Sequence, residues 1–288
     1  MATTPTCPSR SDPASSTTRP PCSWWRRSLQ RVTGPGSSLA GSLSPLLLLC
    51  FAPLWDDLYA GQINTFVLLA LALALLWSNR GSQVAAGTAL AVAVVLKTSP
   101  LLLGLHFVVR RQWRAIGAAG VVVLLLSAAA ALVWKVEYLG TYVDVSLRAA
   151  NSRFDYMNLS PQVLWLRCCG EGAAAMLHKA VCVAALVFAL RGPGVYARLV
   201  VVMTMASPLV WYHHLVYLLV PIVALLRTAP LAAWMAVGLI QVERPVADHW
   251  PALAAVPTVL AALVLYCARY GGRDGVTAAR DTSDRPAA

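Results

Sequence analysis

Long apolar runs follow one another through the middle of this chain and leave little room for a water-exposed surface. Several of them approach the roughly 20 residues that a helix needs to cross a bilayer. Only 12% of the residues are charged, against about 25% in soluble domains. The sequence therefore predicts an all-α, polytopic integral membrane protein. The runs lie at about 38–55, 62–78, 84–97, 99–109, 115–134, 173–190, 196–209, 214–226, 229–240 and 252–268.

Positive charge flanks the apolar runs instead of forming one basic face. The formal net charge of +11 would suit a nucleic-acid partner, but most arginines lie at the ends of apolar runs, which argues against one. Arginines in such positions orient membrane spans, since they collect on the cytoplasmic side. We therefore expect a multi-pass protein of the cytoplasmic membrane, in contact with membrane lipids and not with nucleic acid.

The two ends of the chain differ in composition from its middle. Residues 1–37 are rich in Ser, Thr, Pro and Arg and predict a disordered cytosolic tail, because such a composition cannot build a core. Residues 270–288 form a second polar, cytosolic tail. Residues 38–269 remain as the transmembrane domain, with about eight to ten helical segments and a long outer loop at 135–172.

Two long apolar stretches contain a proline and allow two topologies. Residues 84–109 and 196–226 could each be one broken span, or each a pair of short helices in a hairpin or re-entrant arrangement. If the N-terminal arginines are cytoplasmic, the hairpins also keep the cluster RRQWR at 110–114 inside, whereas single spans send it outside. We therefore predict hairpins that break at "KTSP" and "SPLVW".

This topology places most polar side chains with chemical potential on the extracytoplasmic face. The cytoplasmic connections then carry little besides Arg, Gly and Ser. One polar face is typical of an enzyme or a receptor, whereas a transporter binds its substrate at the membrane midplane. The outer segments are "DDLYAGQIN" (56–64), "LKTSP" (96–100), the loop at 135–172, "SPLVWYHH" (207–214) and "QVERPVADHW" (241–250).

Two adjacent histidines, His213 and His214, are the first candidates for a site. They follow a proline break and Trp211 inside an apolar run, where an imidazole is costly to bury without a function. Either both only line the membrane interface, or one faces a cavity and binds a phosphate while the other holds structure. Adjacent positions do not converge on one ion, so we expect no metal here.

Lys97, Gln62 and Asn64 are further candidates at helix ends. Lys97 precedes Pro100 at a break, where its ammonium either extends to the interface or binds the phosphate of an anionic lipid. Gln62 and Asn64 follow Gly61, and we expect Gln62 in the first turn of a helix. Their amides either end the loop or hydrogen-bond a sugar hydroxyl or a phosphate.

Four motifs follow one another over about residues 45–226. They are "GQIN", "NRGSQVAAGTALAVAVVLKTSPLLL" followed by "RRQWRA", "NLSPQVLWLR" and "SPLVWYHHLVYLLVPIVALL". No single motif would suffice, but together and in this order they resemble those of glycosyltransferase family 87, whose members are multi-spanning enzymes of the GT-C class. No P-loop or GxGxxG motif is present, in keeping with a donor that lacks a nucleotide.

The resemblance implies a GT-C-like helical bundle with its active face outside the cytoplasmic membrane. It implies an α-mannosyltransferase, or a related pentose transferase, that uses a polyprenyl-phosphate sugar as donor substrate. The acceptor would be a lipid-linked or cell-envelope glycan, and no cofactor or divalent metal is implied. The residues that match family positions near the donor phosphate and sugar are Gln62, Asn64, Lys97, Asn158, His213 and His214.

The beginning of the chain departs from the family pattern. Family members start with further transmembrane helices and an early outer loop whose aspartate is thought to be the catalytic base, whereas residues 1–37 contain no apolar helix. We therefore expect an N-terminally truncated member, in which Asp56 or Asp57, close to Gln62, is the remaining candidate for a base. The alternatives are a non-catalytic remnant and a transporter or flippase for lipid-linked sugars.

Overall fold

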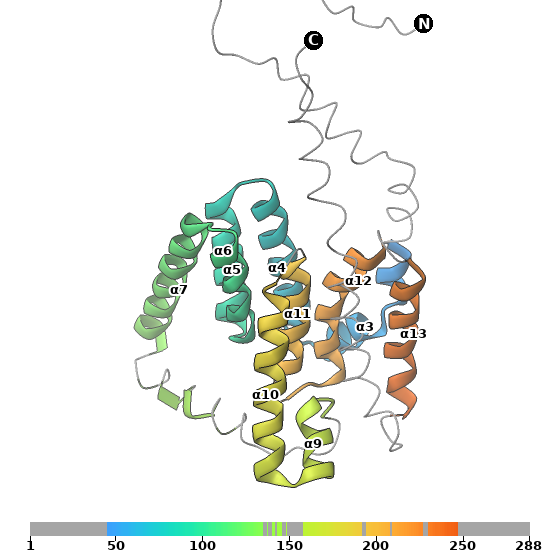
Figure 1. Ribbon diagram of the computed structural model, residues 1–288. Helices are drawn as coiled ribbons and strands as arrows, with labels where there is room; N and C mark the ends of the chain where they lie inside the picture. The colour runs from blue at the N-terminus through green and yellow to red at the C-terminus, as the bar shows by residue number, and fades with distance from the viewer. Residues whose placement is uncertain are drawn as a thin grey trace, which may run out of the picture.

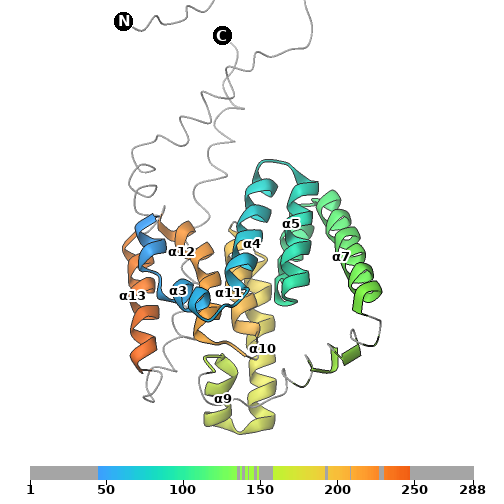
Figure 2. The same ribbon diagram turned by 180° about the vertical axis from the view of Figure 1, so that it is seen from behind.

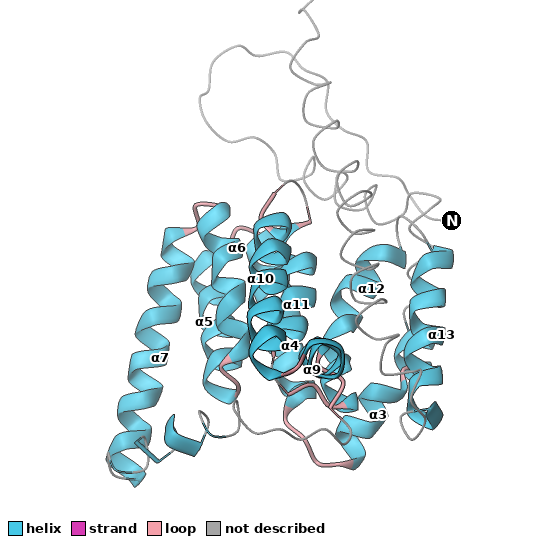
Figure 3. Ribbon diagram, turned by 60° about the horizontal axis from the view of Figure 1, so that its bottom comes forward, coloured by secondary structure: helices cyan, strands magenta, loops and turns pink. Residues whose placement is uncertain are grey.

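All regular structure in the described part of the chain is helical (Figure 3), as the sequence predicted. The predicted tails at 1–37 and 270–288 and the apolar run at 252–268 lie outside the described residues. The computed structural model describes residues 45–134, 158–191, 194–207, 209–226 and 230–246, with isolated positions between 137 and 148.

Most of the helices coincide with predicted apolar runs. A short helix at 45–50 comes before α3. In chain order, the helices from α3 onward are α3 (Ala52–Tyr59), α4 (Asn64–Asn79), α5 (Gln83–Leu96), the 3-10 helix η1 (Ser99–Leu103), α6 (Gly104–Val109), α7 (Trp113–Trp134), α9 (Pro161–Cys169), α10 (Glu171–Ala189), α11 (Val195–Ala206), the 3-10 helix η2 (Tyr212–Leu218), α12 (Leu219–Leu226) and α13 (Pro230–Val246).

The chain reverses direction inside the first long apolar stretch, as the hairpin prediction requires. Helix α5 ends at Leu96, and Lys97 has an extended backbone with φ −157° and ψ 130°. Pro100 then lies in the first turn of η1, where its missing N–H is tolerated. Helices η1 and α6 return toward the end from which α5 began (Figure 1).

The connections before α5 and after α6 lie side by side at one end of the bundle (Figure 1). Arg110 Nη1 donates to Asn79 Oδ1 at 2.8 Å, and Ser78 Oγ donates to Gln112 Oε1 at 2.8 Å. We call this the arginine end, after the arginines in both connections. The opposite end, which holds the chain breaks after α5 and α11, is the break end.

A second reversal follows α11 at the break end. Ser207 and Trp211 are extended, and η2 and α12 pack back against α11. Helix α11 is buried along nearly its whole length and occupies the centre of the bundle (Figures 1 and 2). The second hairpin therefore supplies much of the core.

Among the described residues, two helices are long and apolar enough to cross a membrane by length and composition, Trp113–Val133 and Glu171–Ala189. The outer face of α7 is exposed, with Leu132 at 87% and Leu124 at 71%. A row of exposed apolar side chains is unfavourable in water and is expected where a helix meets lipid. The opposite face of α7 lies so close to α5 that a Cβ on Gly87 of α5 would come within 2.0 Å of the carbonyl oxygen of Ala115 in α7.

Two helix boundaries differ from the predicted apolar runs. Asp56 and Asp57, which follow the predicted run at 38–55, lie within helix α3, and α13 continues to Val246 beyond the predicted run at 229–240. Within the segment 135–172, residues Pro161–Cys169 form helix α9. The Ser160 hydroxyl accepts a hydrogen bond from the Gln162 N–H at 3.4 Å and caps this helix, with a proline directly after the cap.

Candidate functional site

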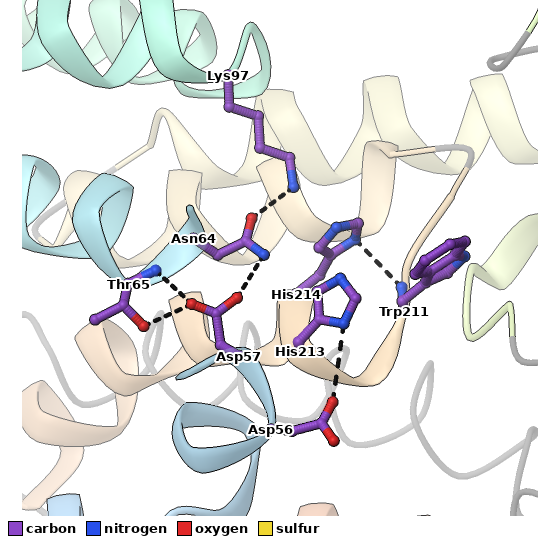
Figure 4. Close-up of polar contacts among 8 residues, drawn as sticks. All are labelled: Asp56, Asp57, Asn64, Thr65, Lys97, Trp211, His213 and His214. Atoms are coloured by element: carbon purple, nitrogen blue, oxygen red, sulfur yellow. Dashed lines mark hydrogen bonds and ion pairs between the residues drawn. The ribbon is translucent and has the colours of Figure 1, made fainter. Parts of the chain in front are cut away.

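The break end brings together residues from motifs that are far apart in the sequence. Helix α3, the start of α4, the break after α5 and the first turn of η2 all meet there (Figure 4). A polar cluster of this kind inside an apolar bundle is costly unless its members pair with one another. The predicted site residues that meet in it are Asp56, Asp57, Asn64, Lys97, His213 and His214.

A chain of hydrogen bonds links Asp57 to Lys97 through a buried amide (Figure 4). Asn64 Nδ2 donates to Asp57 Oδ1 at 2.7 Å, and Lys97 Nζ donates to Asn64 Oδ1 at 2.8 Å. Tyr217 Oη donates to the same Asn64 oxygen at 2.6 Å. The amide has one satisfied orientation, because its nitrogen faces a carboxylate and its oxygen faces two donors. We call Asp57, Asn64, Lys97 and Tyr217 the lysine relay.

Asp57 also fixes the beginning of α4. Its Oδ2 accepts from the Thr65 N–H at 2.7 Å and from the Thr65 hydroxyl at 2.6 Å. A negative charge beside the first N–H groups of a helix satisfies and stabilises them. Asp57 is fully buried, with both carboxylate oxygens occupied. The observed contacts of Asp57 are therefore structural, because they hold Asn64 and the beginning of α4 in place.

Lys97 lies in the two-residue connection between α5 and η1, and the relay holds its ammonium in place. Its Nζ also lies 5.4 Å from the centre of the Tyr217 ring, within cation–π range. Burial lowers the pKa of Lys97 to about 8, and the charge of Asp57 opposes this shift. Lys97 is therefore mostly charged at neutral pH, and only one of its three N–H groups bonds to a described residue.

A pocket opens beside this ammonium. Its free volume of about 10 Å³ is room for roughly one water molecule, so a sugar phosphate must widen it on binding. The lining combines one cation with several hydroxyls and an imidazole, which are groups that bind phosphate oxygens. The lining residues are Lys97, Ser99, Met203, Thr204, Ser207, Val210, His214 and Tyr217.

The two histidines have different surroundings. His214 lines the pocket, and its Nδ1 lies 3.2 Å both from the Trp211 backbone nitrogen, which donates to it, and from the Leu209 carbonyl oxygen. His213 is buried, with its Nδ1 3.8 Å from Asp56 Oδ2. The rings meet edge to face with centres 4.7 Å apart. The adjacent imidazoles thus point to different partners, one to the pocket and one to a carboxylate.

Asn158 lies beside the chain break after α11. Its Oδ1 accepts from the Ser160 N–H and from the Val210 N–H, both at 3.0 Å. The Ser160 hydroxyl donates to the Ser207 carbonyl oxygen at 2.9 Å. Asn158 therefore contacts the backbone beside the pocket and is not among the residues that line it.

The position of Gln62 differs from the predicted one, which was the first turn of a helix. Helix α4 begins at Asn64 with Ile63 as its N-cap, so Gln62 precedes the first turn. Its N–H donates to the Asp57 carbonyl oxygen at 2.9 Å. Its half-buried side chain makes no hydrogen bond to another described residue, which leaves the amide available to a ligand.

Tyr217 and Thr65 were missed by reasoning from the sequence. Tyr217 stands three residues after His214 in η2, and side chains at this spacing eclipse in a 3-10 helix. A polar residue at that offset in an apolar run was therefore an available signal.

The described residues contain no group of three or more His, Cys, Asp or Glu that could hold a metal ion, and the expectation of a metal-free site stays a prediction.

Comparison with known proteins identifies the family. The family model for glycosyltransferase family 87 matches residues 22–265. The chain belongs to glycosyltransferase family 87. Searches of curated proteins and of solved structures found no match.

Family membership makes the chain a glycosyltransferase, which binds a sugar donor and an acceptor. The apolar helices and the family together indicate a membrane protein. The match spans every element of the break end, from α3 to η2. The pocket beside Lys97 therefore lies within the part of the chain that carries the family resemblance.

Proposed function

We propose that this glycosyltransferase moves a hexose, mannose as the first candidate, from a polyprenyl-phosphate donor to a lipid-linked or cell-envelope glycan. The observation that carries the proposal is the Lys97 ammonium, which the relay directs toward a pocket with hydroxyl and imidazole groups. A leaving phosphate gains negative charge in the transition state. Preorganised donors in a partly desolvated site stabilise that charge without reorganisation.

In the proposed step, an acceptor hydroxyl oxygen attacks the anomeric carbon while the bond from that carbon to the phosphate oxygen breaks. The electron pair of that bond leaves with the polyprenyl phosphate, and the configuration inverts. Lys97 and His214 hold the departing phosphate, and the Gln62 amide is placed to bind a sugar hydroxyl.

The proton of the acceptor hydroxyl passes to a base. Of the two predicted candidates, Asp57 is fully buried with both oxygens hydrogen-bonded, whereas Asp56 is 21% exposed and lies beside His213. We therefore assign the base to Asp56, with His213 orienting its carboxylate. Asp57 and Asn64 take a positioning role, because their polar atoms already bond to the relay and to Thr65.

The positions of the arginines support an extracytoplasmic active face in the cytoplasmic membrane. Arg80, Arg110, Arg111 and Arg114 all lie at the arginine end or directly beside it. Clustered arginines collect on the cytoplasmic side of a membrane. The break end, with its pocket, would then face outward, where polyprenyl-phosphate sugars are used without a nucleotide.

The test is turnover of labelled polyprenyl-phosphate mannose and pentose donors by the full chain in membranes. We expect Lys97→Ala and His214→Ala to lower kcat/KM by about 10²-fold or more. His213→Ala should mainly lower kcat, because it acts on the base. Lys179→Ala is the matched control, since Lys179 is exposed on α10 and away from the pocket.

Wild-type rates in Lys97→Ala, His214→Ala and His213→Ala would overturn the site. Movement of intact donor across the membrane without sugar transfer would favour the transporter alternative. Donor binding without either activity would favour a non-catalytic chain.

A further inference from the structure

We infer that Asn158 and Ser160 are positioning residues that fix the chain segment 207–211 beside the pocket. The inference rests on the proposed function for its kinetic consequences, but the contacts that carry it are independent of any substrate. We call these contacts the asparagine latch. The latch joins the entrance of α9 to a segment about fifty residues later in the sequence.

The latch consists of four hydrogen bonds across the break end. Asn158 Oδ1 accepts from the N–H groups of Ser160 and Val210, both at 3.0 Å, so both lone pairs of this oxygen are used. The Ser160 hydroxyl donates to the Ser207 carbonyl oxygen at 2.9 Å. Leu159 N–H donates to the Val210 carbonyl oxygen at 2.6 Å.

Both latch side chains are buried, with Asn158 4% exposed and Ser160 2% exposed. The backbone of the segment that they hold is extended at Ser207 and at Trp211, between α11 and η2, and Val210 within it is buried. Buried backbone groups outside regular structure need other partners to satisfy them. Asn158 and Ser160 supply those partners.

The latched segment carries part of the pocket. Ser207 and Val210 line it directly. The Trp211 N–H at the end of the segment donates to His214 Nδ1 and so sets the orientation of that imidazole. Loss of the latch would therefore move a hydroxyl, a backbone wall and an imidazole together, although Asn158 itself lines none of the pocket.

The sequence resemblance places Asn158 near the donor phosphate and sugar. Direct contact with the donor and a role in the latch make opposite predictions for Asn158→Asp. A carboxylate can still accept both N–H groups, so a latch survives this change. A residue that touches the donor phosphate would instead repel it once it carries a negative charge. Asn158→Leu removes the acceptor while it keeps the approximate size, and it should break the latch in either case.

The experiment combines hydrogen–deuterium exchange and turnover on the purified full chain in detergent. We expect Asn158→Leu to raise exchange in peptides that cover 207–214 about tenfold or more, because the Val210 N–H loses its acceptor. Its turnover of labelled polyprenyl-phosphate mannose should fall about 10²-fold through misplaced groups. Asn158→Asp should stay within about threefold of the wild type in both measurements.

Tyr196→Phe is the matched control for burial. Its hydroxyl is buried and donates to the Leu71 carbonyl oxygen at 2.6 Å, away from the pocket lining. This variant loses a buried hydrogen bond but should leave exchange at 207–214 unchanged.

Unchanged exchange at 207–214 in Asn158→Leu would overturn the latch. An Asn158→Asp variant with wild-type exchange and a tenfold higher KM for the donor would also overturn it, in favour of direct contact. If the wild type transfers no sugar, the proposed function fails, and the exchange comparison still decides whether Asn158 holds the segment.

Discussion

The two ends of the bundle each hold buried hydrogen bonds between α4 and the first hairpin, but the two networks differ in charge. At the arginine end, Ser78 donates to Gln112 Oε1 and accepts Gln112 Nε2 on its carbonyl oxygen at 3.3 Å. At the break end, the lysine relay joins a buried carboxylate to an ammonium. The network around Ser78 also includes His106, whose Nε2 lies 3.4 Å from Ser78 Oγ, and among the described residues it holds no Asp, Glu, Lys or Arg side chain. The second network leaves an ammonium beside a pocket.

This difference separates stabilisation from function. A neutral network that satisfies its own members contributes only to packing and register. A buried charge pair is expensive to desolvate and is weak evidence for stability. Its presence at the break end is therefore better explained by what the ammonium does there.

Asp57→Asn is expected to have the largest effect of the variants that test the difference between the two networks. If the NH₂ group of the new amide faces Thr65, the Thr65 N–H loses its acceptor. If it faces the NH₂ group of Asn64, Asn64 must flip and lose its bond to Lys97. In either orientation the negative charge opposite Lys97 is lost. We expect kcat/KM to fall about 10²-fold and the free energy of unfolding to fall by about 2 kcal/mol. Turnover of the donor and thermal unfolding in detergent are the measurements.

Asn64→Ala is the partner variant for Asp57→Asn. If both residues act through Lys97, the double variant should be no worse than the poorer single variant. Additive losses would show that Asp57 acts on the reaction directly.

The pH dependence of turnover gives the next largest effect. The pKa of Lys97 is near 8, so its ammonium is charged at pH 7 and loses its charge as the pH rises through about 8. We expect the wild-type kcat/KM to fall with rising pH in this window. In Lys97→Arg the fall should disappear, because a guanidinium keeps its charge to above about pH 12. An unshifted profile in that variant would assign the titration to another group.

Tyr217→Phe should have a smaller effect. It removes one hydrogen bond to Asn64 Oδ1 but keeps an aromatic ring near Lys97. We expect kcat/KM to fall about fivefold, the equivalent of roughly 1 kcal/mol. Tyr217→Leu removes both contacts and should fall further. Equal losses in the two variants would mean that the hydroxyl alone matters.

Ser78→Ala at the arginine end should change stability alone. It leaves Gln112 Oε1 without its donor and should lower the free energy of unfolding by about 1 kcal/mol. The kcat and KM should match the wild type. A kinetic change would show that the arginine end is coupled to the pocket, which would end the distinction between the two networks.

The sequence by itself determined the helical class, the position of the two chain breaks and the residue types at the break end. Apolar periodicity, Pro100 and the clustered arginines carry this information locally, because each acts through its own stretch of chain. The common location of Asn64, Lys97 and His214 also followed from charge, once the hairpins were chosen.

Only the tertiary structure decided which of these residues face the pocket and which hold others. Asp56 and Asp57 are neighbours with the same side chain, yet one is buried against Thr65 and Asn64 and the other lies beside His213. The bond of Asn158 to Val210 joins residues 52 positions apart, and the bond of Tyr217 to Asn64 joins residues 153 positions apart. Roles of this kind depend on contacts between residues far apart in the sequence, and a local sequence pattern does not show which residues will meet.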